Sequence, residues 1–165
     1  MPELTSQERL QPSLLDRLTD TDRSNTIEPR ERRVLSVQRL RAGVLRDLAW
    51  LLNTGHYEAM EDLGAYPDVR NSVLNYGMPD LTGQSIAGLD PGRLERIVRD
   101  AIVKFEPRIN SRTLKVKVSM ADDRMSRNAM RFDIEGELWA QPTPMALFLK
   151  TELDLESGKV NVTER

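Results

Sequence analysis

The sequence predicts an α+β protein: a two-layer domain in which helices pack on one face of a mostly antiparallel sheet, with a polar N-terminal arm. Apolar residues recur with a period near 3.6 in two segments, 36–53 and 91–105, and with a period of 2 from residue 114 onward. The first 33 residues differ, because 13 of them are charged and seven are clearly apolar. We therefore divide the chain into an arm, 1–33, and a domain, 34–165.

Composition excludes several classes of protein. The 165 residues include no cysteine and one histidine, His56, which rules out a disulfide scaffold and a cysteine- or multi-histidine-ligated metal site in one chain. Twenty-four basic residues balance 26 acidic ones, and this argues against a general nucleic-acid binder. No apolar run reaches the length of a membrane span, and the first residues lack a secretory signal. We expect neither a cofactor nor direct insertion into a membrane.

The arm contains one apolar cluster, formed by Leu14, Leu15 and Leu18. Ser13 is expected to cap a short helix, and Asp16 in its first turn favours the positive end of the helix dipole. The three leucines would then share one face. Either this face docks on the chain's own domain or it binds a partner.

Two amphipathic helices are predicted in the domain. The first covers 36–53 and contains Gly43, which costs up to about 1 kcal/mol relative to Ala; either a close helix or sheet contact explains this glycine or it is a tolerated defect. The second covers 91–105, where Asp90 is placed to cap a helix that has Pro91 in its first position. Both helices carry an apolar stripe, so both are expected to pack on the sheet.

The segment between these helices is mixed in composition. Asp68 is expected to cap a short helix that carries Val69, Val73 and Tyr76 on one face and ends at Gly77. Long connections of this kind in a compact domain are often functional or are ordered by packing.

Strands are predicted where apolar and charged residues alternate, at 114–118, 130–138 and 147–155. A hairpin turn at 156–159 leads into a last strand at 160–162. We expect no later segment of the chain to cover this strand. Its open edge would offer Val160 and Val162 for backbone pairing with a partner strand.

Catalytic chemistry has weak support. A glycosidase needs two carboxylates across a cleft, and the candidates are Asp133, Glu135, Glu137 and Glu152. All four occupy polar positions of predicted strands, where charged side chains are typical of a solvated sheet face. His56 follows a helix end and is accompanied by no serine-hydrolase motif.

Glu106, Pro107 and Arg108 form the local feature that stands out on physical grounds. In an extended chain Glu106 and Arg108 project to the same side, and Pro107 fixes the backbone between them. The carboxylate and guanidinium can bond each other and pin the helix end, or bond the charged groups of a partner. A second Glu-Pro-Arg, at 28–30, lies in the polar arm and is interpreted as a chance repeat.

The order of several short segments carries a resemblance to a known family. These segments are LLDRL at 14–18, VLRDLAWLLNT at 44–54, YP at 66–67, SVLNYGMPDL at 72–81 and FEPR at 105–108. As an ordered set they resemble TssE, a baseplate subunit of the type VI secretion system, which is similar to a baseplate wedge protein of contractile-tailed phages. The resemblance extends over about residues 14 to 160.

This resemblance implies a structural subunit without enzymatic activity, in a cytoplasmic assembly docked at the inner membrane. TssE-like proteins join TssF and TssG in the wedge complex, on which the contractile sheath is built. The family's Glu-Pro-Arg motif maps onto Glu106, Pro107 and Arg108 and is implicated in holding the wedge's helical core. The strand-rich end of TssE-like proteins is thought to imitate linking strands of the sheath protein. The alternative is a muramidase-type hydrolase that opens the cell wall during assembly.

Overall fold

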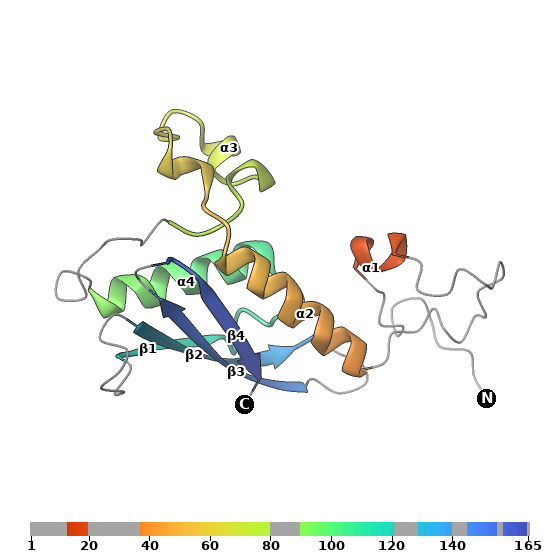
Figure 1. Ribbon diagram of the computed structural model, residues 1–165. Coiled ribbons are helices and arrows are strands. Elements are labelled where there is room, and N and C mark those ends of the chain that lie inside the picture. Colours follow the sequence, from red (N-terminus) through yellow and green to blue (C-terminus); the bar gives the residue numbers. More distant parts are fainter. Residues whose placement is uncertain are drawn as a thin grey trace.

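A computed structural model describes residues 13–19, 37–79, 90–120, 129–139, 145–154 and 157–164, and it confirms the predicted α+β class (Figure 1). The helices are α1 (Leu14–Leu18), α2 (Val37–Leu52), α3 (Pro67–Arg70) and α4 (Pro91–Phe105), with 3-10 turns η2 (Tyr57–Ala59) and η3 (Val73–Asn75). The strands are β1 (Lys115–Met120), β2 (Ala129–Leu138), β3 (Met145–Asp154) and β4 (Val160–Glu164).

The strands form a four-stranded sheet in the order β1-β2-β3-β4, and every neighbouring pair is antiparallel. Consecutive strands are therefore neighbours in space, as short hairpin connections favour. In the register, Val116 lies opposite Ile134, and Ile134 lies opposite Leu149. Because side chains alternate between the two faces of a strand, this register gathers the apolar positions on one face.

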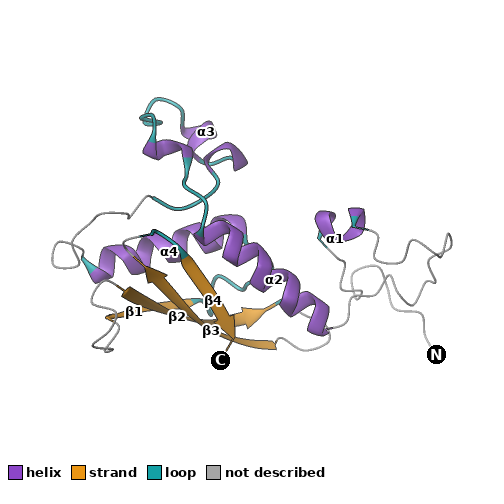
Figure 2. Cartoon of the chain, viewed as in Figure 1, coloured by secondary structure: helices purple, strands orange, loops and turns teal. Residues whose placement is uncertain are grey.

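Helices α2 and α4 cover the apolar face of the sheet, as Figure 2 shows. Helix α4 packs against β1 and α2 packs against β4, while the two helices also contact each other. The core is made of leucine, isoleucine, valine, methionine and phenylalanine from both layers; its members include Leu40, Val44, Leu48, Leu94, Val98, Ile102, Phe132, Ile134, Leu149 and Leu153. The predicted two-layer arrangement is thus observed.

Two predicted helix caps are confirmed. The side chain of Ser13 accepts a hydrogen bond from the backbone N–H of Asp16 at 3.3 Å, and that of Asp90 accepts one from Gly92 at 3.0 Å. The predicted cap at Asp68 is wrong, because α3 begins at Pro67 and Asp68 lies inside its first turn. A proline is favoured at the first helical position, where its missing N–H removes no hydrogen bond. The predicted extent to Gly77 is also wrong, because α3 ends at Arg70 and a separate 3-10 turn follows at Val73–Asn75.

The segment after α4 runs across the end of β2 and is fixed to it. The carbonyl of Arg108 accepts a hydrogen bond from the N–H of Trp139 at 2.7 Å, and Asn110 donates to the carbonyl of Glu137 at 2.8 Å. Gly136 lies beneath this crossing, and a Cβ atom there would come within 3.3 Å of Ile109. The absence of a side chain at 136 therefore lets the segment that carries Arg108 lie close to the sheet.

Most of the arm, 1–33, lies outside the described residues, as do the second Glu-Pro-Arg at 28–30 and Leu155. The division into arm and domain therefore stays a prediction. In the hairpin turn between β3 and β4, Gly158 has a positive φ of 68°, and its N–H donates a hydrogen bond to the carbonyl of Asp154 at 2.7 Å.

Candidate functional site: a polar network joining α1, α2 and the end of α4

Glu106 and Arg108 bond each other at the junction between α4 and the sheet. Helix α4 stops because Pro107 disfavours the α conformation at Glu106, which adopts φ −123° and ψ 77°. Arg108 Nε then donates to Glu106 Oε1 at 2.6 Å, and Arg108 Nη2 donates to Glu106 Oε2. This two-point contact matches the planar fork of the guanidinium to the carboxylate. Glu106 is buried, with 3% of its surface exposed.

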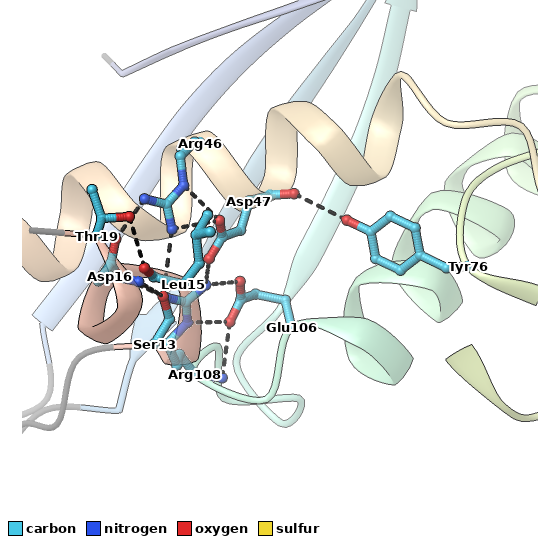
Figure 3. A network of polar contacts seen from close by, with 9 residues as sticks. All are labelled: Ser13, Leu15, Asp16, Thr19, Arg46, Asp47, Tyr76, Glu106 and Arg108. Atoms are coloured by element: carbon cyan, nitrogen blue, oxygen red, sulfur yellow. Dashed lines mark hydrogen bonds and ion pairs between the residues drawn. The ribbon is translucent and has the colours of Figure 1, made fainter. Parts of the chain in front are cut away.

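Asp47 of α2 extends the pair to a second helix. Its Oδ2 accepts a hydrogen bond from Arg108 Nη2 at 2.6 Å, across 61 positions of sequence (Figure 3). One guanidinium thereby bonds two carboxylates and ties the C-terminal end of α4 to the middle of α2. The hydroxyl of Tyr76 adds a weaker bond to the carbonyl of Asp47 at 3.4 Å.

Arg46 carries the network to α1. Its Nε donates to Asp47 Oδ1 at 2.8 Å, and its Nη1 donates to Asp16 Oδ1 at 2.5 Å. The hydroxyl of Ser13 donates to the other oxygen of Asp16 at 2.6 Å. Helix α1 is therefore joined to the domain through polar contacts, and the network runs from Glu106 to Ser13 across three helices.

The charges in this network stabilise one another. Burial works against the positive charge of Arg108, but hydrogen bonds and charges from Glu106 and Asp47 outweigh it and raise the pKa of Arg108. The hydrogen bond from Arg46 is the main cause that lowers the pKa of Asp16, and the same bond raises the pKa of Arg46. At neutral pH every one of these three groups is charged.

Gly43 lies beneath the place where α1 meets the network. A Cβ atom at this position would lie 3.4 Å from Asp16 Oδ2 and 3.6 Å from Arg108 Nη1. Gly43 and Asp47 are four residues apart and so share one face of α2. Two charged side chains therefore approach this face of α2, at distances that leave room for a methyl group but not for a larger side chain.

The leucines of α1 point outward. Leu14 and Leu18 are 70% and 75% exposed, and Leu15 is 41% exposed. Of the two interpretations left open by the sequence, docking of this face on the chain's own domain does not agree with these exposures. The polar side of α1 makes the contact with the domain instead.

The edge of β4 is partly occupied. Asn53, just after α2, donates from Nδ2 to the carbonyl of Val160 at 2.8 Å and accepts at Oδ1 from the N–H of Val160 at 2.9 Å. Both polar groups of Val160 therefore point away from β3. Because alternate residues of an antiparallel strand bond to the same side, the N–H and C=O of Val162 point to the same outer edge. Among the described residues none is recorded as bonding Val162 there.

The four candidate carboxylates of a glycosidase belong to β2 and β3, at positions opposite basic residues or small ones. Asp133 lies between Lys117 and Lys150 in the register, and Glu152 lies opposite Arg131. Opposite charges at paired positions stabilise a sheet and are typical of its solvated face. Within the described ranges no group of acidic or histidine side chains is placed to hold a metal ion, and none of the helices there is long and apolar enough to cross a membrane.

Sequence reasoning singled out Glu106, Pro107, Arg108 and the leucines of α1, and it missed three connecting residues, Arg46, Asp47 and Asn53. For Asp47 the available signal was its spacing from Gly43, since a glycine one turn away leaves room for a partner of the aspartate. No local pattern marks Asn53, because its partner lies 107 residues away.

Comparisons with known proteins give one family. The model of the family described as baseplate wedge protein gp25 matches residues 38–143, which include α4, β1, β2 and all of α2 except its first residue. Neither the curated proteins nor the solved structures contain a significant match.

Proposed function

The chain belongs to the family of baseplate wedge protein gp25, a family of baseplate structural proteins, and from this membership we propose that it is the TssE-like subunit of a type VI secretion baseplate. In this role it joins TssF and TssG in the wedge complex and helps to start assembly of the contractile sheath. The assembly is cytoplasmic and docks at the inner membrane, without insertion of this subunit into the lipid.

One observation carries the proposal beyond the family: α1 shows its apolar face to solvent while its polar face is bonded into the network. An exposed leucine face on an ordered helix is the arrangement by which amphipathic helices enter the groove of a partner. We infer that Leu14, Leu15 and Leu18 are buried on assembly. The network sets the direction in which they point.

In this proposal a wedge partner also contacts the chain at Pro107 and Arg108, and Glu106 supports that contact from inside. Pro107 is exposed, and the side chain of Arg108 is 23% exposed, so a partner can reach the network from outside at these two residues. Glu106 is buried and holds the guanidinium of Arg108 in its orientation. A wedge partner that contacts Arg108 would therefore meet a group that is already positioned.

The edge of β4 is the proposed site of sheath contact. A sheath strand would pair with the outward N–H and C=O of Val162, since strand addition uses the backbone groups of an uncovered edge. At Val160 the same strand would have to displace Asn53.

The proposal is tested by co-expressing the chain with TssF and TssG and purifying the complex. The triple substitution of Leu14, Leu15 and Leu18 by Ser is expected to abolish co-purification without lowering the melting temperature. Phe148→Ser is the matched control, because Phe148 is exposed on the outer face of the sheet, 46% accessible. Failure of the unsubstituted chain to co-purify would refute the proposal.

Two further experiments test the finer parts of the proposal separately. Val162→Pro removes one outward donor at the edge and is expected to leave the wedge complex intact while sheath assembly fails to start. Hydrolysis of purified peptidoglycan by the chain would instead support the muramidase alternative, and loss of that activity in Asp133→Asn or Glu152→Gln would locate it.

A further inference from the structure

A lobe formed by residues 56–77 projects from the domain beyond the C-terminal end of α2, shown in yellow at the top of Figure 1. Its two ends lie side by side. A parallel bridge joins Gly55 to Met78, the N–H of His56 donates to the carbonyl of Met78 at 3.0 Å, and the N–H of Met78 donates to the carbonyl of Thr54 at 2.7 Å. The chain thus leaves and re-enters the domain at one closed neck.

The lobe is ordered by its own interior. The side chain of Asn75 is buried, accepts a hydrogen bond from the N–H of Glu58 at 2.9 Å and donates to the carbonyl of Arg70 at 3.1 Å. Leu63 is buried as the lobe's apolar centre. Gly77 has a φ of +125°, and a Cβ atom there would lie 2.3 Å from the carbonyl oxygen of Thr54, so the neck requires glycine.

The lobe is also fixed to the rest of the domain. The ring of Tyr76 meets that of Phe105 edge-on, with 5.1 Å between the ring centroids. The ammonium of Lys104 donates to the carbonyl of Arg70. Both contacts come from the last turn of α4, so the position of the lobe follows that of a core helix.

Large apolar side chains cover the outside of this ordered lobe. Met60 is 87% exposed, Val73 78% and Leu74 70%, and Tyr66 and Tyr57 are also exposed. The turns η2 and η3 pack against each other, which brings the neighbourhood of Met60 close to that of Val73 and Leu74. Isolated exposed apolar residues are ordinary, but a group of this size on one small lobe is typical of an interaction surface.

The lobe is acidic as well as apolar. It contains four carboxylates, Glu58, Glu61, Asp62 and Asp68, against one guanidinium, Arg70. Arg70 pairs with Glu58 at 2.9 Å. Burial lowers the pKa of His56 below its ordinary 6.5, so the imidazole is predominantly neutral at pH 7. Within the described part of the chain, no ion pair is recorded for Glu61, Asp62 or Asp68.

We propose that this lobe is a docking surface for a partner protein segment in which large apolar side chains are flanked by lysine or arginine. The apolar side chains of the segment would cover Met60, Val73 and Leu74, and its cations would form ion pairs with Glu61, Asp62 and Asp68. Among the described residues, two of these carboxylates keep free oxygens for this, since Glu61 and Asp62 each accept one hydrogen bond, from the hydroxyl of Tyr57 and the N–H of Gly64. The surface is separate from α1 and from the edge of β4, so the inference stands on different residues from the proposed baseplate contacts.

The test uses the full chain and two synthetic helical peptides with the same leucine spacing, one with lysine and one with glutamate at the polar positions. The leucine–lysine peptide is expected to bind at least about tenfold more tightly than the leucine–glutamate peptide and to shift the NMR signal of the Met60 methyl group. Equal affinity for both peptides, no binding of either, or signal changes confined to other methionines would overturn the inference.

Variants locate the binding to the lobe. Val73→Ser combined with Leu74→Ser, and Glu61→Lys combined with Asp62→Lys, are each expected to weaken the leucine–lysine peptide about tenfold or more with an unchanged melting temperature. Phe148→Ser and Glu135→Lys are the controls on the exposed sheet face and should bind as the unsubstituted chain does. If the lobe variants also bind unchanged, the docking surface is elsewhere and the inference fails.

The peptide experiment and the wedge co-purification have separable outcomes. If the unsubstituted chain fails to co-purify with TssF and TssG, the baseplate proposal is refuted. The peptide experiment then still decides whether the lobe is a docking surface. Normal co-purification with no preference for the basic peptide refutes the lobe inference and leaves the baseplate proposal in place.

Discussion

The side-chain amide of Asn53 bonds both backbone polar groups of Val160, at 2.8 and 2.9 Å, and so takes the place of a neighbouring strand at the edge of the sheet. The residue that follows α2 thereby covers the first position of β4. Uncovered strand edges promote pairing between molecules, and proteins commonly block them. Here Asn53 covers the backbone groups of Val160 but, in the part of the chain that the structure describes, leaves the outward N–H and C=O of Val162, two residues further along β4, uncovered.

Asn53→Ala is therefore expected to lower the free energy of unfolding by about 1–3 kcal/mol, because two backbone groups lose their partners. It should also increase self-association, because the freed edge is longer. Chemical denaturation and sedimentation velocity measure the two effects. Asn161→Ala, at an exposed position of the same strand, is the control. A monomeric Asn53→Ala protein with unchanged stability would show that the amide contributes nothing at the edge.

Arg108→Ala is expected to destabilise the domain by about 3 kcal/mol, because it leaves the buried carboxylate of Glu106 without its counter-charge. This destabilisation lies at the lower end of the range for breaking buried ion pairs, because the side chain of Arg108 is 23% exposed. Adding Glu106→Gln should recover part of the loss, since no buried charge then remains.

The coupling energy between Glu106 and Arg108 is measured by a double-mutant cycle, with urea denaturation of the two single variants and the double variant. Arg112→Ala, an exposed arginine on the same connection, serves as the control and should change stability by less than about 0.5 kcal/mol. Additive effects of the two substitutions would contradict a coupled pair.

Gly43 offers a test of the contact between α1 and α2. A methyl group fits, since its nearest neighbours would lie at 3.4 and 3.6 Å, so Gly43→Ala should stabilise α2 by up to about 1 kcal/mol. Gly43→Leu has no such room and should displace Asp16 and Arg108. Thermal unfolding compares the two; a destabilised Gly43→Ala protein would mean that the charged side chains cannot yield even a few tenths of an ångström.

The attachment of α1 should depend on pH through Asp16. The hydrogen bond from Arg46 lowers the pKa of Asp16 below its ordinary 3.8. A carboxyl whose pKa is lower in the folded state stabilises the contact above its unfolded pKa, and that contribution is lost as the pH falls through the folded value. NMR signals of the Leu15 methyl groups should therefore report release of α1 below about pH 3.8.

Asp16→Asn is the control for this titration, since its amide does not ionise. The variant should hold α1 less firmly at neutral pH and show no step in the acidic range at Leu15. A step of equal size in the variant would assign the release to another group. Arg46→Gln should likewise loosen α1 at neutral pH, which amide hydrogen exchange over 14–18 would detect.

The local sequence determined the class of the fold and most of its elements. The period of 3.6 in α2 and α4, the period of 2 in the strands, and the caps at Ser13 and Asp90 all depend on residues within a few positions of each other. A helix or strand needs only such neighbours to select its backbone conformation, so these features are visible in the chain itself.

Tertiary structure decided how the functional side chains meet. Asp47 and Arg108 are 61 residues apart, and Asn53 and Val160 are 107 residues apart. A polar pair of this kind depends on the packing of whole elements and leaves no period in the sequence. The sequence accordingly allowed Glu106 and Arg108 either to bond each other or to face a partner. The fold placed Glu106 in the interior and Asp47 within reach of Arg108, because burial of the apolar faces of α2 and α4 brings those two side chains together.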